Sequence, residues 1–214
     1  MNLANNIADR LLQINAIKLN ATNPFTWASG LRSPIYCDNR LILSFPAERK
    51  IIIKALTRQA STYSGLEAVA GVATAGIAWG AYVAEALELP YCYVRSKPKE
   101  HGLKNLIEGR LPSNAKVLVI EDLISTGGSS LEAVSALQDE FYDVVGVLSI
   151  FQYCFQTAKE KFQLKNIKFS SLTDFETLLV RALQTNFINK DDFNRLQSWN
   201  HDPKLWSDQF ENHN

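Results

Sequence analysis

The sequence has no excess of charge of either sign, because 22 lysines and arginines balance 22 aspartates and glutamates over 214 residues. Nucleic-acid-binding proteins usually carry a basic surplus, so this balance disfavours that class. No apolar run approaches the ~18 residues of a membrane span, and Asp9 and Arg10 interrupt the first apolar stretch, so we expect neither a membrane helix nor a signal peptide. No predicted strand is followed by GxGxxG, which disfavours a dinucleotide-binding domain.

Cysteine is also scarce, with three residues at Cys37, Cys92 and Cys154. Their odd number, wide spacing and apolar or aromatic neighbours favour buried thiols over disulfides or a metal site. Together with the absence of a signal peptide, this predicts a reducing cytoplasmic location. The 46% hydrophobic content is enough for one full core, and no repeat or linker divides the chain. We therefore predict a single domain over residues 1–214.

The most informative stretch runs from Val117 to Ser130 and reads VLVIEDLISTGGSS. Its apolar start, 117–120, is typical of a buried parallel strand. Two acids follow, Glu121 and Asp122, and then small polar residues and a glycine pair. Apolar residues recur at helical spacing after Ser130. The predicted order is strand, acidic pair, small-residue loop, helix.

A small-residue loop that opens a helix points free backbone N–H groups at one spot, and this is typical of a phosphate site. Gly127 and Gly128 would let the backbone approach the anion closely. Two carboxylates just upstream would repel that phosphate, but they suit a neighbouring group with hydroxyl donors, such as a ribose. The pattern indicates a ribose 5-phosphate site, although an acidic, glycine-containing strand–helix turn without a ligand also fits it.

A second strand–loop–helix unit is predicted at 67–87, with the small residues Ala73, Thr74, Ala75 and Gly76 in its loop. By itself this is weak evidence for an anion site. In consecutive units, however, both loops would open at the same carboxyl edge of a parallel sheet. Between the units, the polar stretch Arg95–Arg110 has no strand or helix period. A loop this long in a compact domain is usually functional or disordered, and its cations predict a flap that closes over a polyanion.

The Val117–Ser129 stretch resembles the signature of the type I phosphoribosyltransferases. It is distinct from a nucleotide P-loop, which would need a lysine after its glycines, where this chain has Ser129 and Ser130. The resemblance implies that Glu121 and Asp122 hold the ribose hydroxyls of phosphoribosyl pyrophosphate (PRPP). It also implies that the loop holds the 5-phosphate. The implied PRPP-binding loop residues are Leu123, Ile124, Ser125, Thr126, Gly127, Gly128 and Ser129.

Two further stretches are similar to members of that family whose acceptor base is orotate. One is NPFTWASGLRSPIYC at 23–37, predicted as a hairpin in a small N-terminal hood; a plain hairpin without a ligand also fits. The other is the flap, where Arg95, Lys99 and His101 match residues that contact pyrophosphate. The resemblance makes Lys99, His101 and Asp122 the expected catalytic residues. Many such members carry lysines where this chain has Ala28 and Ser96.

The expected reaction is transfer of ribose 5-phosphate from PRPP to orotate, which gives orotidine 5-monophosphate and pyrophosphate for UMP synthesis. Ser125 is expected to face orotate. Mg²⁺ is expected as cofactor, held mainly through substrate oxygens, so no side chain is assigned as a metal ligand. A homodimer that shares the 95–110 flap between subunits is expected, with no nucleic-acid or membrane partner. A purine acceptor, and a nucleic-acid-binding regulator that kept the fold, remain alternatives.

The resemblance and the alternating strand and helix patterns predict an α/β fold. It is type I phosphoribosyltransferase-like, with a mainly parallel central sheet, helices on both faces and a small N-terminal hood. Residues of about 1–40 would form the hood, and the C-terminal helices would pack on the core. Besides 67–72 and 117–120, strands are predicted at 91–94, 144–151 and 167–172.

Overall fold

The computed structural model describes residues 2–27, 29–97 and 106–211. The chain divides into two compact units. We name Phe45–Leu172 the core unit, and Met1–Ser44 together with Thr173–Asn214 the terminal unit. The prediction of one domain over 1–214 stays a prediction, but the C-terminal helices group with the N-terminal segment. None of the described helices combines the length and hydropathy needed to cross a lipid bilayer.

The core unit is built on a six-stranded sheet with the order β10-β9-β8-β5-β6-β7. Its strands are β5 (Ala68–Val72), β6 (Tyr91–Val94), β7 (Ile107–Glu108), β8 (Lys116–Ile124), β9 (Asp143–Gln152) and β10 (Phe169–Asp174). β5 pairs in parallel with β6 and β8, and β8 with β9, whereas β7 is antiparallel to β6. This confirms the predicted mainly parallel sheet.

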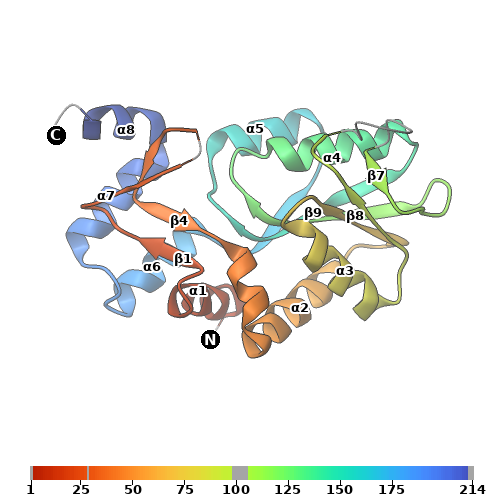
Figure 1. The fold of residues 1–214 in the computed structure, drawn as a ribbon, viewed down its shortest axis with the longest axis horizontal. Helices are drawn as coiled ribbons and strands as arrows, with labels where there is room; N and C mark the ends of the chain where they lie inside the picture. The colour runs from red at the N-terminus through yellow and green to blue at the C-terminus, as the bar shows by residue number, and fades with distance from the viewer. Residues whose placement is uncertain (1, 28, 98–105, 212–214) are drawn as a thin grey trace. The chain divides into compact units, whose positions relative to one another are not determined.

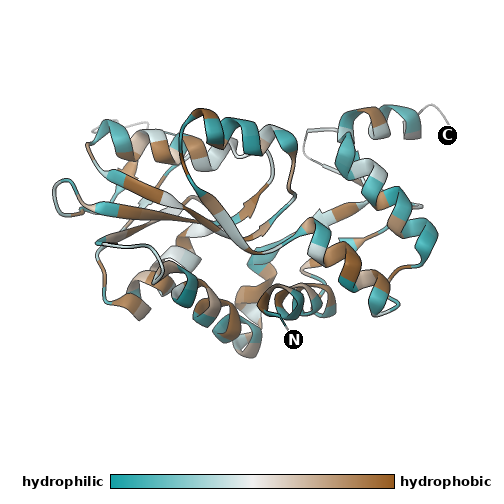
Figure 2. Ribbon diagram, turned by 180° about the vertical axis from the view of Figure 1, so that it is seen from behind, coloured by the Kyte–Doolittle hydropathy of each residue, from teal (hydrophilic) through white to brown (hydrophobic). Residues whose placement is uncertain are grey.

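Four helices cover the two faces of this sheet. They are α2 (Pro46–Ala60), α3 (Gly76–Leu87), α4 (Gly128–Asp139) and α5 (Gln156–Leu164). α2 and α3 lie on one face and α4 and α5 on the other (Figure 1). All five residues of β5 are buried, because a strand covered on both faces meets apolar side chains on each side. The strands are accordingly brown along much of their length in Figure 2.

The terminal unit joins both ends of the chain. Its elements are α1 (Leu3–Gln13), β1 (Ile17–Leu19), β2 (Phe25–Thr26), β3 (Arg32–Ser33), β4 (Ile35–Cys37), a 3₁₀ helix (Asn39–Ser44), α6 (Phe175–Gln184), α7 (Lys190–His201) and α8 (Pro203–Glu211). The predicted hairpin is partly wrong. Phe25 pairs with Ser33, whereas Ile35–Cys37 pairs with Ile17–Leu19.

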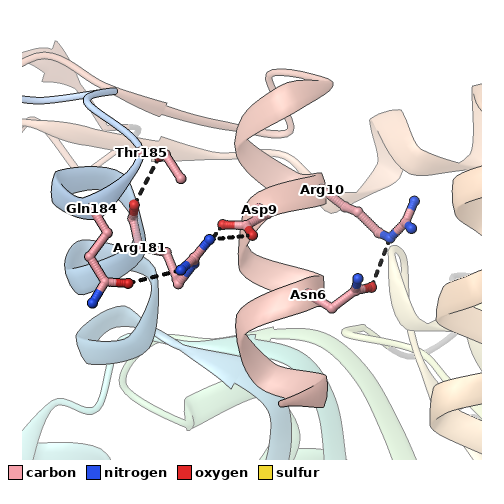
Figure 3. A network of polar contacts seen from close by, with 6 residues as sticks. All are labelled: Asn6, Asp9, Arg10, Arg181, Gln184 and Thr185. Carbon is pink, nitrogen blue, oxygen red and sulfur yellow. Dashed lines mark hydrogen bonds and ion pairs between the residues drawn. The ribbon is translucent and has the colours of Figure 1, made fainter. Parts of the chain in front are cut away.

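Polar contacts connect α1 to α6 within the terminal unit (Figure 3). The Arg181 Nε and Nη2 groups donate to the two carboxylate oxygens of Asp9, at 2.9 and 2.8 Å. Arg181 Nη1 also donates to Gln184 at 2.8 Å. The Arg181 and Asp9 side chains are only 16% and 15% exposed, so solvent screens this two-pronged ion pair weakly.

Candidate active site

The two small-residue loops of the core unit line one cavity at the carboxyl edge of the sheet. Ala73, Thr74 and Ala75 follow β5, and the loop after β8 contributes the facing wall. The cavity holds about 310 Å³. Parallel neighbours end at the same edge, so the pairing of β5 with β8 is what brings the loops together. The predicted meeting of the two loops is confirmed.

Close packing of α3 on β5 and β8 sets the first loop in place. A Cβ added at Gly76 would lie 2.5 Å from the Ile120 carbonyl oxygen, and one at Gly71 would lie 2.8 Å from the Gly76 oxygen. Only glycine fits such backbone-to-backbone approaches. These glycines therefore allow the 73–75 loop to reach the wall formed by β8.

The acidic pair lies within β8 rather than after it. The strand runs to Ile124, whereas the sequence predicted its end at Ile120. Its pairing with β9 continues through Glu121, opposite Ser149, to Ile124, opposite Gln152. Glu121 is buried at 5% exposure and Asp122 is half-buried, and both line the cavity.

Glu121 is held by three hydrogen bonds. Its Oε1 accepts from the Asp122 backbone N–H at 3.0 Å. Its Oε2 accepts from the hydroxyls of Ser129 and Ser130, each at 3.3 Å. Burial raises the pKa of this carboxyl well above its usual value, and the nearby Asp122 charge raises it further. Glu121 thus connects the strand to the first turn of α4.

The loop from Ser125 to Gly127 then turns the chain into α4, which begins at Gly128. Gly127 has φ +76°, and a Cβ there would lie 2.7 Å from the Phe162 ring. At Gly128 an added Cβ would meet no atom within 4 Å. Gly127 is therefore required by the turn itself, whereas Gly128 leaves open space at the helix N-terminus, where free N–H groups attract an anion.

Comparison with known proteins places this site in a family. The phosphoribosyl transferase domain matches residues 45–176. The chain is 48% identical to the orotate phosphoribosyltransferase of Porphyromonas gingivalis over 94% of this chain and 96% of that protein. It is 52% identical to that of Bacillus pumilus, covering 92% and 93%. The chain belongs to the orotate phosphoribosyltransferase family. The crystal structure of the Aeropyrum pernix enzyme, 27% identical, superposes with a TM-score of 0.74 and covers 86% of this chain and 99% of that one.

Most residues that the family signature predicted for PRPP line the cavity. They are Glu121, Asp122, Leu123, Ser125, Thr126, Gly127, Gly128 and Ser129. Ile124 is the exception, because it is buried in the core at 1% exposure. Lys99 and His101, expected in the flap, and Ala28 lie outside the described residues.

Arg95, the first residue of the expected flap, follows β6. Its Nη1 donates to Glu108 at 3.3 Å, and its backbone N–H donates to the Leu106 carbonyl at 2.8 Å. The short strand β7 thus closes a hairpin with β6, which the sequence did not predict. Arg95 lines a neighbouring cavity of about 540 Å³, which shares Ala73, Gly128 and Ser129 with the first.

Two site features were missed in the sequence. Ser130 is 1% exposed and bonds to Glu121, but nothing in the sequence distinguishes it from Ser129. Glu108 pairs with Arg95 from thirteen residues away, and this spacing matches neither the helix period nor the strand period, so the sequence could not predict the pair. In the described ranges, no group of three or more histidines, cysteines or acids is placed to hold a metal ion.

Proposed function

We propose that this chain transfers ribose 5-phosphate from PRPP to orotate and releases pyrophosphate, forming orotidine 5-monophosphate for pyrimidine synthesis. The observation that carries the proposal is the cavity of about 310 Å³, in which an acidic pair and two small-residue loops meet. The family supplies the chemistry that this cavity suits, because a diol can donate to the acids while a phosphate accepts from backbone amides.

We assign the PRPP roles from the family signature, and the residues that line the cavity support this assignment. The loop from Ser125 to Ser129 binds the 5-phosphate through its amides and hydroxyls. Asp122 and Glu121 face the ribose hydroxyls, with Asp122 as the more exposed acid. The 73–75 loop lies across the cavity and is assigned to the pyrophosphate. Leu123 contributes to the wall, and Ser125 faces the orotate ring.

Catalysis rests on charge stabilisation and positioning. The transition state at the ribose C1 resembles an oxocarbenium ion, so the barrier falls when the sugar is held still and the leaving pyrophosphate is neutralised. No covalent nucleophile is needed. Arg95, Lys99 and His101 are assigned to the pyrophosphate, with Lys99 and His101 as catalytic flap residues. Asp122 is assigned as the catalytic carboxylate that holds the ribose.

The Lys99 assignment has a direct test. Lys99→Ala should lower kcat by about 10²- to 10³-fold, because a preorganised charge at the leaving group is lost, while the circular dichroism spectrum and Tm stay unchanged. Lys54→Ala, at an exposed position on α2 outside the flap, is the matched control and should retain full activity. If Lys99→Ala turns over as fast as the unaltered chain, the flap assignment is wrong.

The residues present fit a Mg²⁺ ion that is bound chiefly through substrate. Asp122 and Glu121 offer hard oxygen donors, but the described residues supply no complete metal cage. Mg²⁺ keeps several waters and commonly binds substrate phosphates with one or two carboxylates. When bound, it would neutralise pyrophosphate charge as a Lewis acid. Pyrophosphate release should therefore stop when EDTA removes Mg²⁺.

We further propose a homodimer that shares the flap, and a cytoplasmic location in which the three cysteines stay thiols. No nucleic-acid or membrane partner is proposed. The homodimer is tested by light scattering, and by mixing Lys99→Ala subunits with Asp122→Asn subunits. A shared flap predicts that the mixture regains part of the activity that each variant lacks, and no recovery would refute sharing.

A base competition assay tests the function itself. The chain is incubated with PRPP, Mg²⁺ and one of four bases: orotate, uracil, adenine or hypoxanthine. Pyrophosphate release is expected with orotate and not with the others. Release with a purine and not with orotate would replace the proposed acceptor. No release with any base, together with a shifted nucleic-acid band in a gel, would favour a binding protein that kept the fold.

A further inference from the structure

Ser130 belongs to no part of the proposed substrate site. It is 1% exposed, it is not among the described residues that line the cavity, and it is the third residue of α4. Its hydroxyl nevertheless donates to Glu121 Oε2 at 3.3 Å, the same oxygen that receives the Ser129 hydroxyl. Burying two polar groups costs free energy unless they bond to each other, so this contact indicates that the position of the two groups matters.

The contact joins the two elements that form the phosphate site. Glu121 belongs to β8, and Ser129 and Ser130 belong to the first turn of α4. Between them lies the loop whose residues line the cavity. The remaining carboxylate oxygen accepts the Asp122 N–H at 3.0 Å. The Glu121 side chain therefore connects the start of this loop to its end, and it also bonds to the backbone of Asp122.

The first turn of α4 has no other side-chain cap. Gly127 at the N-cap offers no side-chain oxygen, and no acidic residue lies in the first turn. Glu121 reaches this turn from the neighbouring strand and accepts hydroxyls that extend from it. These contacts are at the N-terminal end of the helix, where a polar partner stabilises it.

We propose that Glu121 and Ser130 are positioning residues, which hold the first turn of α4 so that its amides meet the 5-phosphate. This role deepens the proposed function, on which it rests, and is additional to the contact of Glu121 with the ribose. If Glu121 only contacted the ribose, its substitution would not change the affinity for a ligand that lacks the diol. If Glu121 positions the loop, its substitution would weaken the binding of any phosphate to that loop.

The test compares two inhibitors competitive with PRPP, ribose 5-phosphate and inorganic phosphate. Ser130→Ala should raise the Ki of both by a similar factor of about 3- to 10-fold, because one buried hydrogen bond is lost. The KM for orotate should stay within about twofold. Ser135→Ala, five residues further along α4, removes a hydroxyl outside this contact and should leave both Ki values unchanged.

Glu121 variants give a second, independent readout. Glu121→Ala should also raise the Ki of inorganic phosphate. Glu121→Gln should restore it, because the amide oxygen can face the Asp122 N–H while the amide donates to the serine hydroxyls, which also accept. The Ki values of the Glu121 variants test the positioning role if Ser130→Ala does not fold.

Two results would overturn the proposal. One is an unchanged Ki for inorganic phosphate in both Ser130→Ala and Glu121→Ala, and the other is an effect confined to ribose 5-phosphate. The unaltered chain is assayed in parallel. If it forms no orotidine 5-monophosphate, the proposed function has failed, whereas an active chain with unaffected variants refutes only the positioning role.

Discussion

At the scale of single residues, two adjacent acids on one strand have different environments. Glu121 is buried and bonded to the α4 serines, whereas Asp122 is half-buried, and both residues line the cavity. The two carboxyl groups are close enough for the Asp122 charge to raise the pKa of Glu121. The sequence could identify both acids, because the motif is contiguous, but it could not divide their roles while the strand was expected to end at Ile120.

Asp122→Asn tests the ribose assignment. The substitution removes the charge that polarises the ribose hydroxyls and keeps the size of the side chain. We expect KM for PRPP to rise about 10-fold or more, as for loss of a charged hydrogen bond, with KM for orotate changed less than twofold. Steady-state kinetics with each substrate varied in turn measures both. Equal effects on the two substrates would contradict the ribose role.

The raised pKa of Glu121 predicts how stability depends on pH. A carboxyl group with a higher pKa in the folded than in the unfolded chain stabilises the fold below its unfolded pKa of about 4.3, and this contribution is lost as pH rises through the folded pKa. Glu121→Gln has no such proton. In the ligand-free chain, its Tm relative to the unaltered protein should therefore increase as the pH is raised from about 4 to about 8.

Differential scanning calorimetry across that range provides the measurement. Glu132→Gln, an exposed position on α4, is the control and should show no such trend. A Tm difference for Glu121→Gln that stays constant with pH, or that falls as pH rises, would mean that burial does not hold this carboxyl in its protonated form.

At the scale of elements, the glycine pair divides into one residue for the fold and one for the ligand. Gly127→Ala should lower the free energy of unfolding by about 1–3 kcal/mol, because φ is positive and the Phe162 ring blocks the Cβ. Gly128→Ala should fold with unchanged stability. Its methyl group would stand in the cavity, and KM for PRPP should rise about 10-fold.

Urea unfolding and steady-state kinetics on both variants check this pair. The opposite pattern, in which Gly128→Ala is unstable and Gly127→Ala binds PRPP poorly but folds well, would contradict the division of roles.

Most elements of the core unit could be predicted from sequence, because its strands are short apolar runs and its helices show helical periodicity. β6 has the predicted bounds of 91–94. The end of β8 could not be predicted, since Glu121 and Asp122 are poor strand residues whose pairing with β9 decides the matter. The partner of Ile35–Cys37 was likewise missed, because pairing with β1 is a tertiary choice.

At the scale of the whole molecule, both ends of the chain build one unit. The Asp9–Arg181 pair joins residues that lie 172 positions apart. The sequence predicted a hood at about 1–40 and C-terminal helices packed on the core, but it could not show that the two ends contact each other, because that contact is a tertiary choice.

Arg181→Ala should lower the free energy of unfolding more than Gln184→Ala does, because it leaves the Asp9 carboxylate without its partner. Gln184→Ala removes one exposed hydrogen bond to the same guanidinium and should cost less than about 0.5 kcal/mol. Urea unfolding followed by tryptophan fluorescence compares them. Equal stabilities of the two variants would show that the ion pair does not hold α1 to α6.

The most direct test of the whole account is a crystal structure with ribose 5-phosphate bound. The phosphate is expected within hydrogen-bond distance of the backbone amides from Thr126 to Ser129, with the ribose hydroxyls donating to Asp122. A ribose that lies elsewhere, with Glu121 and Asp122 both turned away from it, would contradict the account.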